Sequence, residues 1–191
     1  ILIRSIAEDL LEDVYKELLK INLADYGAAT IRDITSCPGT STCNLGITST
    51  YNVADVIEKL LVSEFNELIF KEEITIKISG CMNACGQHSV ADIGFHGSSF
   101  NSNGVTVPAL QVLLGGSNLG NGDAQLSDKI IKVPTKRVEH VIRFLLNDFK
   151  QNKIAFETFN IYYNRKGKIY FYDLLKPLVD VAKVSDDELL D

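Results

Sequence analysis

Apolar residues recur at helical spacing in several stretches of the chain. The first stretch opens with Ser5-Ile6-Ala7-Glu8, a sequence typical of a capping box, and predicts an amphipathic helix over residues 6–20. A longer helix is predicted over residues 53–70. Pro134 is expected to open a third helix, because proline is favoured in a first helical turn. A last helical segment is predicted over residues 156–164.

Four other stretches have the pattern of strands. Ile74-Thr75-Ile76-Lys77-Ile78 alternates in polarity, is rich in β-branched residues and leads directly to Cys81. A short strand over residues 29–35 is expected to deliver Cys37, and further strands are predicted over 89–95 and 105–114. The predicted fold is therefore of the α/β (α+β) class, a central mixed sheet flanked by helices, with cysteines at strand ends.

The length of 191 residues allows one core, or one domain with an appended element. We expect an N-terminal helix and linker over 1–28, an α/β domain that carries the cysteines over 29–150, and a C-terminal helical extension over 151–191 that packs back on it. Ile1 opens the chain without a methionine, so we expect a piece of a longer protein.

Composition and charge narrow the possible partners. The chain is 46% hydrophobic and 23% charged, and its net charge of −6 argues against nucleic acid or an acidic membrane as partner. No stretch approaches the roughly 18 continuous apolar residues that a membrane span needs, and no secretory signal is visible. We therefore expect a cytoplasmic protein, in which cysteines serve as metal ligands more often than as disulfides.

The four cysteines form two tight pairs, Cys37-x5-Cys43 and Cys81-x3-Cys85. Thiolate sulfur is a soft ligand that suits iron–sulfur clusters, zinc or cuprous ions. The gap within the first pair is long for zinc, which usually closes on pairs with about two to four intervening residues. Four cysteines is the number that a 4Fe–4S cluster requires. The spacing alone favours a cluster, with zinc and unligated or disulfide-forming thiols as the alternatives.

The residues around these pairs closely resemble the cluster signature of the sirohaem-dependent nitrite and sulfite reductases. That family shows Cys-x5-Cys and then Gly-Cys-x-Asn-x-Cys, and the second pair here reads Gly80-Cys81-Met82-Asn83-Ala84-Cys85. The resemblance continues through residues 91–95 and 113–120 and covers roughly residues 25–175. It implies the C-terminal, cluster-binding half of an assimilatory-type reductase, and with it the fold of that haemoprotein.

The resemblance also implies roles for individual residues. The cluster would be held by Cys37, Cys43, Cys81 and Cys85. The Cys85 thiolate would also bridge the cluster to the iron of sirohaem, which makes it the catalytic residue of this chain. Asn83 and Asn118 stand where the family approaches the prosthetic group, although Asn83 could instead form a loop hydrogen bond to backbone. The implied reaction is the six-electron reduction of nitrite to ammonia or of sulfite to sulfide.

No lysine or arginine occurs from Asp33 to Glu58, or from Ile78 to Asp128. Sirohaem is multiply carboxylated and its substrates are oxyanions, so binding them without cations would cost several kcal/mol per ion. The resemblance implies that the N-terminal half of the same reductase supplies the cations, and that this chain alone is inactive. It implies a ferredoxin or a flavoprotein as electron donor.

Two other functions are compatible with the cysteines. A 4Fe–4S electron-transfer protein without a substrate site would explain the loops that lack cations, and a zinc-stabilised structural domain would explain the thiols. His88 and His96 lie near the second pair, but four cysteines already complete a cluster. We therefore expect both histidines to be structural or at the surface. Gly80 and Gly86 flank the second pair, where we expect them either to let the backbone approach the cluster closely, with a positive φ where needed, or simply to form turns.

Overall fold

The computed structural model describes residues 3–102, 105–118 and 124–179. The helices are α1 (Leu11–Lys20), α2 (Thr50–Glu64), α3 (Val138–Asn152), α4 (Phe159–Lys166) and α5 (Lys168–Leu175). The strands are β1 (Thr35–Ser36), β2 (Ile76–Ser79), β3 (Ile93–Ser102), β4 (Val105–Leu114), β5 (Ser117–Asn118), β6 (Ala124–Gln125) and β7 (Asp128–Pro134).

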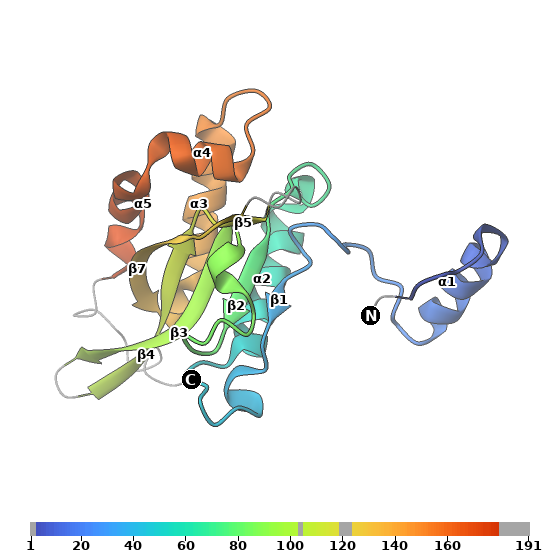
Figure 1. Ribbon diagram of the computed structural model, residues 1–191, viewed down its shortest axis with the longest axis horizontal. Coiled ribbons are helices and arrows are strands. Elements are labelled where there is room, and N and C mark those ends of the chain that lie inside the picture. Colours follow the sequence, from blue (N-terminus) through green and yellow to red (C-terminus); the bar gives the residue numbers. More distant parts are fainter. Residues whose placement is uncertain (1–2, 103–104, 119–123, 180–191) are drawn as a thin grey trace.

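Five of the strands form a central sheet in the order β1-β2-β3-β4-β7 (Figure 1). Strands β1, β2 and β3 run parallel, whereas β4 pairs antiparallel with both β3 and β7. The short strands β5 and β6 pair separately. The sheet is therefore mixed and flanked by helices, which confirms the predicted fold class.

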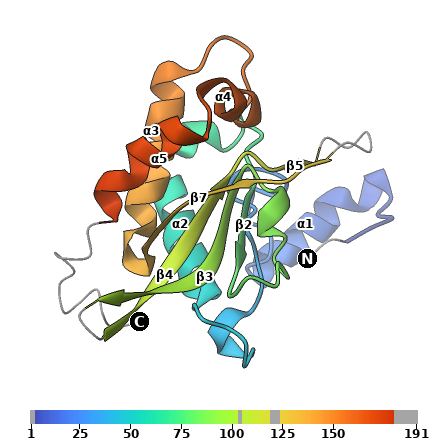
Figure 2. The same ribbon diagram turned by 60° about the vertical axis from the view of Figure 1, so that its left-hand side comes forward.

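Helices α2 and α3 cover one face of the sheet (Figure 2). Their apolar stripes, which include Ile57 of α2 and Leu145 of α3, are fully buried against sheet residues such as Ile78 and Phe95. Burying one such side chain contributes about 1.5–3 kcal/mol. This layer is the main core, and it holds the strand ends from which the cysteine loops emerge.

The C-terminal helices pack on the end of α3 through aromatic rings. Tyr162 of α4 lies 5.3 Å from Phe149 and 5.8 Å from Phe171 between ring centroids. Its hydroxyl donates to a carboxylate oxygen of Asp148 at 2.5 Å. Burial, together with this hydrogen bond, raises the pKa of Tyr162. Helix α4 therefore packs on α3. The predicted division of the chain at residues 28 and 150 stays a prediction, and residues 180–191 lie outside the described part.

The N-terminal helix α1 stands away from the sheet (Figure 1), and none of its residues is buried. The predicted capping box is wrong: Ser5 has a φ of 60°, and no side chain caps the helical segment, which starts with a 3-10 turn at Glu8. Serine must have extended backbone to serve as an N-cap, so Ser5 cannot do so here.

Four predicted elements differ from the structure. The strand predicted over 89–95 begins only at Ile93, after a 3-10 turn at His88–Val90. The strand predicted over 29–35 is limited to its last residue, because residues 29–32 form turns and the chain pairs with β2 only from Thr35. Pro134 ends the edge strand β7, where its missing N–H is tolerated, and α3 begins four residues later. The helix predicted over 53–70 begins three residues earlier and gives way to a 3-10 turn after Glu64.

One strand of the central sheet and one helix were not predicted at all. Strand β7 extends the sheet beyond β4, and α5 follows α4 after Gly167, whose φ of 80° ends the first helix. Within the described residues, no helix is both long enough and apolar enough to cross a bilayer.

Candidate iron–sulfur site

All four cysteines line one cavity of about 150 Å³. Cys37 and Cys43 reach it from the loop between β1 and α2, and Cys81 and Cys85 from the loop after β2. Cys43 and Cys85 are exposed, whereas Cys37 and Cys81 are half-buried. The four thiols predicted as ligands come from two distant parts of the sequence, and the structure brings them together. Their ligation of iron stays a prediction.

The first pair is held by backbone hydrogen bonds at the end of the parallel strands. The amide of Cys37 donates to the carbonyl of Ile78 at 3.1 Å, which extends the pairing of β1 with β2 by one residue. Pro38 and Gly39 then turn the chain, and the amide of Cys43 donates to the Gly39 carbonyl at 3.0 Å. The hydroxyl of Thr50, at the start of α2, donates to the carbonyl of Cys37. Sheet and helix therefore fix this loop from both sides.

The second pair lies in a tight loop between β2 and β3. Ala84 and Gln87 both have left-handed backbone, with φ of 57° and 58°, and the amide of Gln87 donates to the Ala84 carbonyl at 2.8 Å. Such residues persist only where the surroundings hold them. This conformation brings the exposed Cys85 back to the same cavity as Cys81.

The two cysteine loops touch each other through glycines. A Cβ at Gly80 would lie 2.6 Å from the Cα of Gly39, and the carbonyl of Gly80 accepts a hydrogen bond from Ile47 at 2.8 Å. The Gly80 amide also donates to the Sγ of Cys37 at 3.1 Å. Neither Gly80 nor Gly86 has a positive φ, so that part of the prediction is wrong. Close approach of two backbones, rather than an unusual φ, is what requires glycine at position 80.

Ser79 and His88 support the second loop from beneath. The Ser79 hydroxyl accepts the amide of Gly86 at 3.0 Å and lies 2.8 Å from Nδ1 of His88. Both His88 and His96 are buried, with ring centroids 4.9 Å apart. The histidines are therefore structural, as expected. Ser79 is a supporting residue that the sequence did not reveal, because its partners come from the far side of the loop.

Burial lowers the pKa of His88 to about 4, with smaller contributions from His96 and Lys129. Burial also lowers the pKa of His96, against a hydrogen bond to the Gly97 carbonyl that raises it. Both imidazoles are therefore neutral at pH 7. Nδ1 of a neutral His88 can accept a hydrogen bond from the Ser79 hydroxyl, while the Ser79 oxygen accepts one from the Gly86 amide. The three groups therefore form a consistent chain of hydrogen bonds.

This burial predicts a loss of stability in mild acid. The folded-state pKa of His88 is about 4, below its ordinary 6.5, so the unfolded chain binds the proton first. Stability should be full above pH 6.5, fall as the pH drops, and level off near pH 4. The loss should be on the order of 1–3 kcal/mol, measured by urea unfolding at a series of pH values.

A His88→Gln variant should reduce that pH dependence to the part that buried His96 contributes, because glutamine keeps a hydrogen-bonding group without a titrating proton. His140→Gln is the control, since His140 is exposed on α3 and should leave the curve unchanged. A wild-type curve that stays flat between pH 6.5 and 4 would contradict the buried neutral imidazole.

Asn83 and Asn118 occupy different situations. Asn83 is exposed and lines the cysteine cavity, and within the described part of the chain its side chain forms no hydrogen bond. The alternative of a loop hydrogen bond is therefore not what the structure shows. Asn118 lies in β5, paired with Ala124, and its side chain is outside the described part. Their contact with a prosthetic group stays a prediction.

The spacing of the thiols bears on which metal they suit. Within the described residues, no three His, Cys, Asp or Glu side chains converge on a point where one metal ion could bind. A tetrahedral zinc site draws every sulfur to about 2.3 Å from one metal. In a 4Fe–4S cluster each thiolate binds a different iron, so the sulfurs lie farther apart. The structure places the four thiols around one cavity, and the identity of the metal that they bind stays a prediction.

Residues 91–95 and 113–118, which extend the resemblance to the reductase family beyond the cysteines, have structural roles. Asp92 accepts hydrogen bonds from the amide and hydroxyl of Thr75 at 2.9 and 2.7 Å, which ties the start of β3 to β2. A Cβ at Gly94 would lie 2.1 Å from the carbonyl oxygen of His88. Gly115 meets the ring of Tyr163, and its carbonyl accepts the side-chain amide of Asn160 at 2.9 Å. These residues hold the sheet and helices around the cysteine loops.

Comparison with solved structures supports the architecture. The structure of the Mycobacterium tuberculosis NirA protein matches with a TM-score of 0.71 at 23% identity, over 87% of this chain and 31% of that one. Dissimilatory sulfite reductase I (DsrI) matches with a TM-score of 0.64 at 14% identity, over 96% of this chain and 60% of that one. At these identities the likeness shows a shared fold.

Sequence comparison adds relatives of named activity, all of them oxidoreductases. A ferredoxin–nitrite reductase of Synechococcus elongatus is 30% identical over 147 residues, which cover 76% of this chain and 28% of the relative. A sulfite reductase [ferredoxin] of Mycobacterium tuberculosis is 29% identical over 119 residues, 61% of this chain and 21% of the relative. The chain thus spans about a quarter of the length of these relatives. The model of the nitrite and sulphite reductase 4Fe-4S domain matches residues 27–168. This chain therefore belongs to the nitrite and sulphite reductase 4Fe-4S domain family.

Proposed function

We propose that this chain is the cluster-bearing part of a sirohaem nitrite or sulfite reductase, which carries out the six-electron reduction of nitrite to ammonia or of sulfite to sulfide. The observation that carries the proposal is the single cavity lined by Cys37, Cys43, Cys81 and Cys85. Family membership supports a 4Fe–4S cluster as the group that these thiolates hold, with sirohaem beside it.

The residues around the cavity fit a cluster. Its thiols come from two loops that backbone hydrogen bonds hold at the ends of parallel strands. The Gly80 amide at 3.1 Å from Cys37 Sγ would stabilise the charge of that thiolate. Hydrogen bonds to cluster sulfurs also tune the reduction potential. Gly80 of the second loop would therefore adjust how readily a cluster bound at Cys37 accepts an electron.

Cys85 is the residue that would connect the cluster to sirohaem. Cys43 and Cys85 are both exposed, and family resemblance rather than exposure assigns the second contact to Cys85. When bound, sirohaem supplies the iron at which the oxyanion is reduced. In the proposed arrangement Cys85 would hold both the cluster and sirohaem, and the Asn83 amide, in the same loop, would offer sirohaem a hydrogen bond.

Charges for the substrate and for the sirohaem carboxylates must come from elsewhere. The spans 33–58 and 78–128 contain no lysine or arginine. An oxyanion bound there without cations would cost several kcal/mol. We therefore propose that the N-terminal half of the same reductase supplies the cations. Because the relatives are named as ferredoxin-dependent enzymes, we propose a ferredoxin as the electron donor.

The proposal is tested with the native protein that carries this chain. Purified anaerobically and supplied with reduced ferredoxin, it should convert nitrite to ammonium or sulfite to sulfide, measured as product formed per electron donor oxidised. A protein that retains its cluster and exchanges electrons with ferredoxin, yet consumes neither anion, would instead support an electron-transfer protein without a substrate site. The loops that lack cations are the observation that favours that second candidate.

A further inference from the structure

A cavity of about 600 Å³ lies between the starts of β2 and β3, the short strand β5 and the start of α4. It shares no residue with the cysteine cavity. Its charged lining residues are Glu73, Lys77 and Asp92, and the other lining residues are Thr75, Val90, Ser117, Thr158, Asn160 and Ile161. Two carboxylates against one ammonium give the lining a net negative charge.

Asp92 is the buried charge of this cavity. It is 9% exposed, and within the described residues its carboxylate forms no ion pair. The hydrogen bonds that it accepts from another residue both come from Thr75, at 2.9 and 2.7 Å, and both go to Oδ2. Burial raises the pKa of Asp92, against these hydrogen bonds, which lower it. A buried carboxylate without a cation is costly, and a cation bound beside it would remove part of that cost.

The other oxygen of this carboxylate, Oδ1, is open to the cavity. It accepts no hydrogen bond from another described residue. Among the described residues, the side-chain atoms that are fully buried without a partner belong to Thr48, His96 and Thr135, so Oδ1 of Asp92 is not sealed within the protein. Because Asp92 lines the cavity, this unpaired oxygen is available to a ligand there.

The other two charged residues leave the negative charge uncompensated. Glu73 is exposed, and its carboxylate forms no ion pair with any residue that the structure describes. Nζ of Lys77 donates to Oε1 of Gln87 at 2.7 Å and pairs with neither carboxylate. The cavity therefore has two carboxylates that lack a positive partner.

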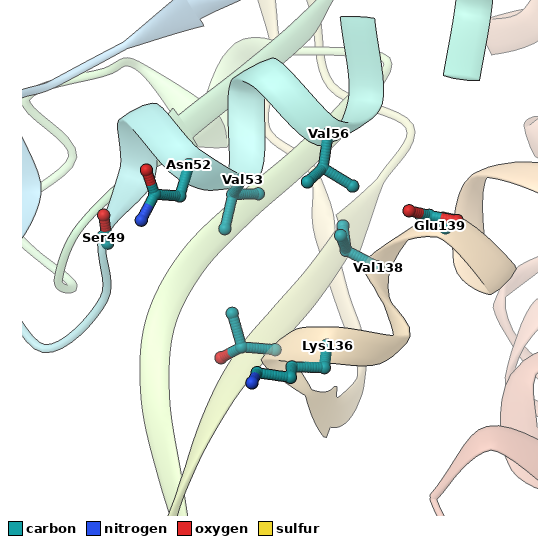
Figure 3. A pocket seen from close by; sticks show the side chains of 8 residues that line it. Ser49, Asn52, Val53, Val56, Lys136, Val138 and Glu139 are labelled. Carbon is teal, nitrogen blue, oxygen red and sulfur yellow. The ribbon is translucent and has the colours of Figure 1, made fainter. Parts of the chain in front are cut away.

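The cavity in Figure 3, between the starts of α2 and α3, shows the opposite situation. Its charged lining residues are Lys136 and Glu139. Glu139 pairs with Arg143 at 3.1 Å, and Lys136 also has a partner. Charges that are already compensated give no sign of a ligand, whereas the carboxylates of Asp92 and Glu73 do.

The rest of the lining at Asp92 indicates what kind of cation fits. In the described part of the chain, no three His, Cys, Asp or Glu side chains gather where a metal ion could bind. Val90 and Ile161 add apolar surface, which favours an apolar group over water. A bare metal ion would leave that surface unfilled, and an organic cation would cover it.

We propose that this cavity binds a small organic ammonium ion with a short apolar chain. Oδ1 of Asp92 accepts a hydrogen bond from the ammonium, Glu73 adds a second negative charge, and the chain lies against Val90 and Ile161. Hydrogen bonds between charged groups are about twice as strong as neutral ones, so Asp92 provides most of the affinity. The site depends neither on the cluster nor on the reductase activity.

The test is a titration of the isotopically labelled 191-residue chain with butylammonium, followed through the backbone amide resonances of residues 75–77 and 90–92. Butan-1-ol, which is neutral and of similar shape, is the matched ligand control. Butylammonium should shift these resonances saturably and butan-1-ol should not. The bound cation should also lower the pKa of Asp92, measured through its carboxyl carbon resonance, because a nearby positive charge favours the carboxylate.

Asp92→Asn should weaken butylammonium binding at least about tenfold, because asparagine can still accept hydrogen bonds from Thr75 but carries no charge. Glu73→Gln should weaken it about two- to fivefold, and this exposed position keeps the test decisive if Asp92→Asn fails to fold. Asp173→Asn is the control, since Asp173 is exposed on α5 and does not line the cavity. It should bind as the wild type does.

Three results would overturn the proposal: equal shifts with butan-1-ol, no saturation with butylammonium, or unchanged affinity in both the Asp92 and the Glu73 variant. Saturable binding of magnesium without binding of butylammonium would overturn the proposed class of ligand.

Discussion

Replacing any one of the four cysteines with serine is expected to remove most of the iron–sulfur content of the chain. The hydroxyl of serine is a hard, weakly acidic ligand that replaces thiolate poorly on iron. Cys37, Cys43, Cys81 and Cys85 all line the same cavity, so each variant should show the loss. The measurement is iron and acid-labile sulfide per chain after anaerobic reconstitution.

Two substitutions within the same loops serve as controls. Ser41 lies in the first loop and Met82 in the second, and both are exposed, so Ser41→Ala and Met82→Ala should bind a full cluster. A cysteine variant that keeps wild-type iron content would remove that cysteine from the ligand set. In the native protein, Cys85→Ser should also abolish the electronic coupling of haem and cluster, and unaltered coupling would assign the bridge to another residue.

The second large effect concerns stability rather than iron. Gly86→Ala should destabilise the chain by about 3 kcal/mol or more, because a Cβ there would lie 2.0 Å from the carbonyl oxygen of Ile78. That carbonyl also accepts the amide of Cys37, so it cannot move without disturbing the first cysteine loop. The measurement is urea unfolding at pH 7.

Gly167→Ala is the matched control for that substitution. Gly167 has a φ of 80° and a ψ of 161°, a region that glycine alone adopts readily, so alanine there strains the backbone by about 1–3 kcal/mol, but no atom lies within 4 Å of the added Cβ. A loss of less than about 1 kcal/mol in Gly86→Ala would contradict the account, because it would show that the Ile78 carbonyl can move away from the added methyl group.

The positions of the cysteines could be predicted because local pattern determines them. The β-branched run ending at Ile78 has the periodicity of a buried strand, and Cys81 follows it directly. The apolar spacing of residues such as Val53 and Ile57 likewise predicts a helix behind the first pair. These two elements predict that each cysteine loop begins at the end of a strand. Because the two strands are neighbours in the sheet, the two loops then meet at one cavity.

The rest depends on contacts between distant segments. The sequence predicts that Pro134 starts a helix, but Pro134 ends β7, where it lies opposite Ala109 of β4. A bulge between Val112 and Leu113 of β4 also shifts the register of this strand pair. Pairing of this kind leaves no local signature. In the same way, the role of Ser79 depends on Gly86 and His88, which reach it only after the loop has folded.

The central claim is that Cys37, Cys43, Cys81 and Cys85 hold a single 4Fe–4S cluster, and the most direct measurement is Mössbauer spectroscopy of the chain after reconstitution with isotopically enriched iron. The account predicts the spectrum of one 4Fe–4S cluster that accounts for four irons per chain, and its loss in the serine variants. Iron that resolves as isolated tetrathiolate sites, or a chain that takes up one zinc ion and no iron, would contradict it.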